Sequence, residues 1–200
     1  MNVFKTYEDA FNDNIANFRH VPDEHKTYDM CLQAVRVNSL QSFFYVPLRF
    51  RTRELCLASL QCPIISSSLH CVPLNLRNRD LCLAFVKHHG YNLCAVPNEH
   101  RSYDLCLLAV KSCGLAISEV PIDLKTHELC LAAVQHYGLS LEYVPENLRT
   151  FEICKAAIRS NYCMPDEIIK HVPKNILDNQ EFNELYRSLL YKEEEDDEEW

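Results

Sequence analysis

Apolar and polar positions recur along this chain with a nearly constant period. Each unit holds an apolar block such as residues 129–134, then a mixed stretch, and then a Val-Pro pair. The pairs begin at Val21, Val46, Val72, Val96, Val120, Val144 and Val172, in steps of 25, 26, 24, 24, 24 and 28 residues. A period in this range predicts a solenoid, in which each unit buries its apolar face against its neighbours.

The register of the unit predicts its helices. Counting the valine as position 0, position 6 carries a residue that can cap a helix: Thr27, Thr52, Asn78, Ser102, Thr126 and Thr150. Position 8 is always acidic, which suits a helix N-terminus. Position 18 holds the three glycines, Gly90, Gly114 and Gly138, where a helix should stop. We therefore predict a helix from about position 7 to position 17 of every repeat.

The stretch between this helix and the next Val-Pro pair, such as residues 139–149, contains a proline. Proline prevents one long helix through this stretch. We expect a second short helix, α or 3₁₀, with a loop as the alternative.

The two ends of the chain are more polar than its middle. We predict an N-terminal cap over residues 1–20, repeats over 21–171 and a C-terminal cap helix over 172–192, forming one domain. The run 193–199 carries seven of the net charge of −8, so residues 193–200 are expected to be a disordered acidic tail. The fold class predicted is an all-α, short-unit α-solenoid of repeats of about 24 residues with capping helices at both ends.

The run 128–135, followed by Gly138 and by residues 143–150, resembles the repeat of the domain-of-unknown-function family 4116. The resemblance covers about residues 21–150, and the segments 37–45 and 62–71 depart from it because they lack the glycine. That family is common in large DNA viruses and in proteins that intracellular bacteria deliver into host cells. The resemblance therefore implies the solenoid fold and an interaction module acting inside a host cell, and it implies no catalytic residue.

The cysteines are expected to be structural. Six of the eleven occupy position 10, namely Cys31, Cys56, Cys82, Cys106, Cys130 and Cys154. Stacked helices lie about 8–10 Å apart, too far for a disulfide, so we interpret this ladder as core. The other five are Cys62, Cys71, Cys94, Cys113 and Cys163, and no Cys-x-x-Cys spacing predicts a zinc site among them. We expect no metal and no cofactor.

No enzyme motif stands out in the sequence, and we expect no catalytic residues. A nucleophile pair of Cys94 with His88 or His89 stays open as the cysteine-enzyme alternative. Position 5 is always basic. We expect these side chains to bond to neighbouring carbonyl groups or to pair with a nearby acid. The alternative is a row of cations that binds an anionic partner. Neither nucleic acid nor membrane is an expected partner, because the chain is acidic and its longest apolar run, residues 81–86, is short.

The function predicted is a non-enzymatic protein–protein interaction module, an effector or regulator acting in the host cytoplasm as a monomer. The expected partner-binding residues are the variable position 7 and two aromatic residues at a break in the repeat: Tyr28, Arg53, Arg79, Tyr103, His127, Phe151, Phe43 and Phe44. The alternative for position 7 is ordinary first-turn packing on the preceding loop. An alternative function is a secreted inhibitor whose acidic tail mimics an anionic ligand. The expected absence of an export signal and the reduced thiols favour the cytoplasm.

Overall fold

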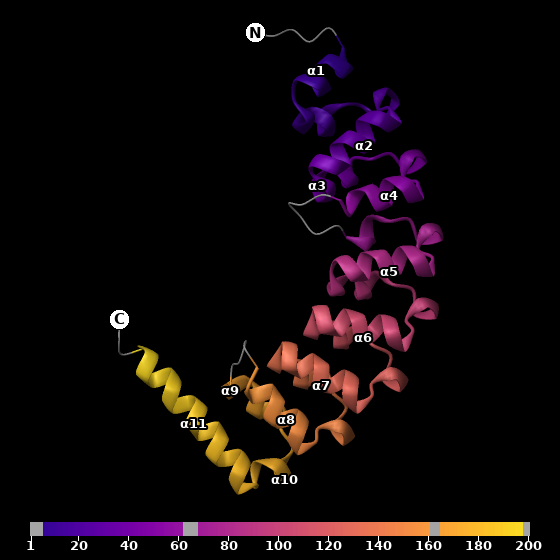
Figure 1. Ribbon diagram of the computed structural model, residues 1–200. Coiled ribbons are helices and arrows are strands. Elements are labelled where there is room, and N and C mark those ends of the chain that lie inside the picture. The colour runs from indigo at the N-terminus through magenta and orange to yellow at the C-terminus, as the bar shows by residue number, and fades with distance from the viewer. Residues whose placement is uncertain (1–5, 62–67, 161–164, 198–200) are drawn as a thin grey trace. The chain divides into compact units, whose positions relative to one another are not determined.

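The computed structural model describes residues 6–61, 68–160 and 165–197, which form helices and contain no strand (Figure 1). The chain is an all-α repeat solenoid, as the period predicted. Its contacts divide it into two compact units, residues 1–100 and 101–200. The boundary falls inside a repeat, between the Val96-Pro97 pair and the helix that follows it, and the single domain expected from the sequence stays a prediction.

The first unit contains both α-helices (α) and 3₁₀ helices (η). They are α1 (Tyr7–Asp13), η1 (Ile15–His20), η2 (Asp23–His25), α2 (Tyr28–Val37), α3 (Ser39–Phe44), η3 (Leu48–Phe50), α4 (Arg53–Ser59), η4 (Leu69–Cys71), η5 (Leu74–Leu76), α5 (Arg79–His88), η6 (Gly90–Ala95) and η7 (Asn98–His100). The second unit contains α6 (Tyr103–Ser112), η8 (Gly114–Glu119), η9 (Ile122–Leu124), α7 (His127–His136), η10 (Gly138–Tyr143), η11 (Glu146–Leu148), α8 (Phe151–Ile158), α9 (Pro165–Ile168), η12 (Ile169–His171), α10 (Lys174–Leu177) and α11 (Gln180–Asp197).

The main helix of every repeat begins at position 7, as the capping residues predicted. The side chain at position 6 accepts a hydrogen bond from the backbone N–H of position 9, for example from Leu129 to Thr126 at 3.3 Å. Ser102 is the exception and makes no such bond. Helices α2, α5, α6 and α7 end at position 16, one residue before the predicted end.

The second segment of the repeat is a 3₁₀ helix of six residues in η6, η8 and η10. A further 3₁₀ turn of three residues follows the Val-Pro pair, so each regular repeat contains one α-helix and two 3₁₀ helices. The first repeat departs from this plan because its second segment, α3, is α-helical. This is one of the segments whose sequence lacks the repeat glycine.

The core repeats with the sequence. Positions 9, 10, 13 and 14 of the complete helices are buried, as in the set Leu129, Cys130, Ala133 and Val134 of α7. All six position-10 cysteines have no exposed surface, which confirms their assignment to the core. Burial raises the pKa of each of these six thiols to about 11, so they are protonated at neutral pH.

The cation at position 5 donates to a backbone carbonyl group at the far end of its own repeat, just before the next Val-Pro pair. All six donate to the residue that precedes the next valine: Lys26 to Tyr45 (2.7 Å), Arg51 to Cys71 (3.1 Å), Arg77 to Ala95 (2.9 Å), Arg101 to Glu119 (2.5 Å), Lys125 to Tyr143 (2.9 Å) and Arg149 to His171 (2.8 Å). We call this contact the carbonyl clamp. Of the roles considered for position 5, hydrogen bonding to carbonyl groups occurs in all six repeats. Lys26 and Arg101 also pair with nearby acids, Asp23 at 2.8 Å and Glu119 at 3.6 Å.

Gly114 and Gly138 are needed for their small size and not as left-handed helix stops. No described glycine has a positive φ. A Cβ atom on Gly114 would lie 2.5 Å from the backbone oxygen of Ala133, and one on Gly138 would overlap the backbone oxygen of Ala157. The helix does end before position 18, but the reason for glycine there is the close approach of the next repeat.

The first and the last helix each begin with a capping hydrogen bond of their own. Thr6 and Asp9 form a reciprocal capping box at the start of α1. At the other end, Asn179 accepts the backbone N–H of Phe182 at 3.1 Å, and Phe182 is fully buried. Helix α11 continues through the acidic run as far as Asp197, where we had predicted disorder from residue 193. Within the described ranges, no helix combines the length and apolar character that a bilayer span requires.

Candidate functional site

Four of the six position-7 residues, which are predicted to bind a partner, contact the following repeat. The Tyr103 hydroxyl donates to Glu128 Oε2 at 2.8 Å, and His127 Nε2 lies 3.3 Å from Thr150 Oγ1. These partners occupy positions 8 and 6 of the next repeat. These position-7 side chains therefore contact the helix-capping residue or the acidic residue of the following repeat. The alternative expected from the sequence was packing on the preceding loop.

The same rule holds in the first unit. The Tyr28 hydroxyl lies 3.3 Å from Thr52 Oγ1, and Arg53 Nη2 lies 3.8 Å from Asp80 Oδ2. Arg53 and Arg79 are both exposed at the first residue of their helices. The Arg53 side chain is 49% exposed, and exposed ion pairs of this length contribute little to stability.

Phe151 contacts the last helix, α11, at the C-terminal end of the second unit. Its ring meets the buried ring of Phe182 edge-on, with 6.2 Å between the ring centroids. Lys155 Nζ lies 5.4 Å from the centroid of the Phe151 ring. Phe151 therefore supports the packing of α11 on α8.

The two adjacent phenylalanines of α3 have opposite environments. Phe43 is 3% exposed and its ring centroid lies 5.5 Å from the Arg51 guanidinium carbon, so its side chain belongs to the core, and its role in partner binding stays a prediction. Phe44 is 66% exposed. Because α3 is a helix, neighbouring side chains point about 100° apart, and here Phe43 faces the core while Phe44 faces solvent.

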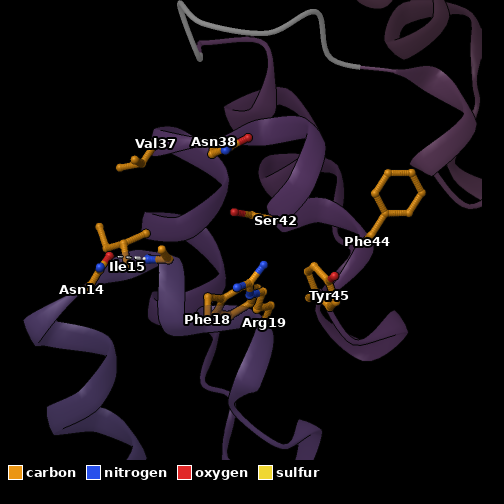
Figure 2. A pocket seen from close by; sticks show the side chains of 10 residues that line it. Asn14, Ile15, Phe18, Arg19, Val37, Asn38, Ser42, Phe44 and Tyr45 are labelled. Carbon is orange, nitrogen blue, oxygen red and sulfur yellow. Dashed lines mark hydrogen bonds between the residues drawn. The ribbon is translucent and has the colours of Figure 1, made fainter.

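A hollow of about 530 Å³ lies beside Phe44 at the N-terminal end of the first unit. It is lined by Asn14, Ile15, Ala16, Phe18, Arg19, Val37, Asn38, Ser42, Phe44 and Tyr45. Figure 2 shows residues of η1 on one side, Val37 and Asn38 from the end of α2 on another, and Phe44 turned outward from α3. Of these ten residues, only Arg19 carries a full charge at neutral pH.

The sequence points to Phe44 but not to the other residues that line this hollow. Its signal was the break in the repeat after α2, and residues 14–19 were treated only as a cap. Because η1 precedes the first Val-Pro pair as η6, η8 and η10 precede later ones, Arg19 and Phe44 are equivalent residues of successive units. Comparing equivalent positions would have paired these two residues.

The remaining cysteines and histidines form no metal centre in the part of the chain that the structure describes. Cys71, Cys94 and Cys113 are half-buried, while Cys62 and Cys163 lie outside the described residues. The imidazole next to Cys94 is that of His70, with 3.1 Å between Nε2 and Sγ. His89, one of the two partners considered from the sequence, uses Nδ1 to accept the backbone N–H of Tyr91.

Comparison with protein families matches three overlapping segments, residues 78–125, 102–149 and 126–177, to the family described as Domain of unknown function (DUF4116). The matches together cover residues 78–177, half of the chain, and the chain belongs to this family. They start later and end later than the resemblance seen in the sequence. No curated protein and no solved structure matched the chain.

Proposed function

We propose that this chain is a non-enzymatic protein-interaction module and that the hollow beside α3 receives a segment of a protein partner. The observation that carries the proposal is the exposure of Phe44 at the rim of a hollow with mixed apolar and polar walls. Aromatic residues beside such a hollow are typical binding anchors.

The division of labour among the repeat positions also supports this function. The residues that recur in every unit, at positions 5, 6 and 10, serve the carbonyl clamp, the helix caps and the core. The irregular first repeat instead leaves an aromatic side chain in solvent. In repeat proteins, departures from the regular unit commonly lie on the binding face.

The chemistry of the hollow favours one kind of segment. Ile15, Val37 and Tyr45 would contact an apolar side chain, and Arg19 would attract a carboxylate. We propose a partner segment that carries an apolar residue next to an acidic one. We place this interaction in a reducing cytoplasm, because none of the nine cysteines that the structure describes is in a disulfide bond.

The Phe44→Ala variant is expected to bind the partner about tenfold or more weakly, as loss of an aromatic anchor does. Its melting temperature should be unchanged, because the Phe44 side chain is 66% exposed. The measurement is affinity capture from cell extract with quantitative mass spectrometry, beside the melting curve of each protein.

Tyr91→Ala is the matched control for this experiment, since Tyr91 is 61% exposed in the same unit and does not line the hollow. It should capture the same partner as the unmodified protein. Equal loss of the partner in both variants, or full capture by Phe44→Ala, would place the binding site elsewhere.

A further inference from the structure

His70 and Cys94 form an imidazole–thiol pair on successive repeats. Each is the second residue before the valine of a Val-Pro pair, so stacking brings them together. His70 Nε2 lies 3.1 Å from Cys94 Sγ. At this distance, the imidazole can accept the thiol proton and leave a thiolate, the form in which cysteine is nucleophilic.

Two hydrogen-bonding side chains fix the backbone on both sides of this pair. The buried Asn92 accepts the backbone N–H of Leu69 at 2.8 Å through Oδ1 and donates to the backbone oxygen of Phe85 at 3.0 Å through Nδ2. Asn92 therefore connects η4, which carries His70, to η6, which carries Cys94, and to the end of α5. A buried amide that is satisfied at both ends resists sliding of one turn past the other.

The clamp cation Arg77 also bonds to both turns. Its Nη2 donates to the backbone oxygen of His70 at 3.2 Å, and its Nη1 donates to that of Ala95, the neighbour of Cys94, at 2.9 Å. Because one planar guanidinium binds both carbonyl groups, their separation is set by its geometry. The side chains of His70 and Cys94 thus start from backbones that are fixed relative to each other.

Solvent can reach this pair, unlike the cysteine ladder. His70 is exposed and Cys94 is half-buried, whereas the six position-10 thiols have no exposed surface. The neighbour Cys71 is also half-buried, and burial raises the pKa of its thiol. Among the described residues, Cys94 therefore lies beside an imidazole, and Cys71, a thiol of similar exposure, serves as an internal comparison.

We propose that Cys94 is a reactive thiol, activated by His70, and that it is a site of covalent modification by small disulfides. His70 Nε2 takes the Cys94 proton, and the thiolate sulfur attacks one sulfur of the disulfide. The disulfide S–S bond breaks as a new S–S bond to Cys94 forms, and the departing thiolate takes the proton back from the imidazolium. The products are a mixed disulfide on Cys94 and one small thiol. This inference does not depend on the proposed partner.

The test is timed exposure of the folded full-length protein to glutathione disulfide, followed by peptide mapping. We expect Cys94 to be modified about tenfold faster than Cys71 and the six ladder cysteines to stay unmodified until the protein is unfolded. A Cys94 rate no higher than that of Cys71 in the unmodified protein would overturn the proposal. This comparison needs no variant.

The role of His70 has its own test. His70→Gln removes the base, so the rate at Cys94 should fall about three- to tenfold at pH 7 and its rise with pH should shift upward. Unmodified ladder cysteines and an unchanged melting temperature would show that the variant is folded. A folded variant that keeps both the rate and the pH profile would show that His70 does not activate Cys94.

Discussion

Gly138→Ala is expected to lower the free energy of unfolding by about 1–3 kcal/mol. Its added Cβ would overlap the backbone oxygen of Ala157 and lie 2.6 Å from both Ile168 Cδ1 and Ser160 Oγ. The backbone N–H of Gly138 also donates to Ser160 Oγ at 2.9 Å, so the two segments cannot separate without loss of this bond. Chemical denaturation of the full-length chain measures the effect.

The sign of this result is informative. Glycine at a negative φ would ordinarily gain about 0.4–1 kcal/mol on replacement by alanine, because the unfolded chain loses freedom. The close approach of α8 reverses that expectation. Glu142→Ala, at an exposed residue of the same 3₁₀ helix, should stay within about 0.5 kcal/mol of the unmodified protein. A neutral or stabilising Gly138→Ala would refute the close-packing role of the glycines.

Arg149→Met is expected to lower the free energy of unfolding by roughly 2–4 kcal/mol. Arg149 donates to the backbone oxygens of Val144 at 2.9 Å, His171 at 2.8 Å and Glu142 at 3.1 Å. Methionine keeps much of the side-chain volume but leaves these carbonyl groups without their donor. Chemical denaturation again gives the change.

Two further substitutions bracket the Arg149 result. Arg149→Lys should cost less, because Lys125 shows that lysine at position 5 can still reach the carbonyl group before the next Val-Pro pair, at 2.9 Å. Arg159→Met replaces an exposed arginine of the second unit and should change stability by less than about 0.5 kcal/mol. If Arg149→Met costs no more than Arg159→Met, the carbonyl clamp does not stabilise the stack.

Local signals in the sequence were enough for the helices. Thr126 and its equivalents mark each helix start because a cap acts within three residues of its own position. The burial of Cys130 followed from the period alone. These features depend on short-range chemistry or on the register of the repeat, both of which can be read along one chain.

Contacts between residues that are far apart in the sequence were harder to predict. The reason for Gly138 is an atom of Ala157, 19 residues away, and the partners of Arg149 include an oxygen 22 residues away. Phe43 and Phe44 are chemically identical, and only the direction of α3 separates the buried one from the exposed one. Equivalent positions in successive repeats do approach each other, and comparing them would have paired His70 with Cys94.

We propose that the module binds its partner at the hollow beside α3. Its most direct test is photo-crosslinking in cell extract, with benzoylphenylalanine in place of Phe44 in one protein and in place of Tyr91 in another. We predict a crosslinked protein partner from position 44 and none from position 91, since only position 44 borders the hollow. No adduct at position 44, or the same adduct at both positions, would contradict the claim.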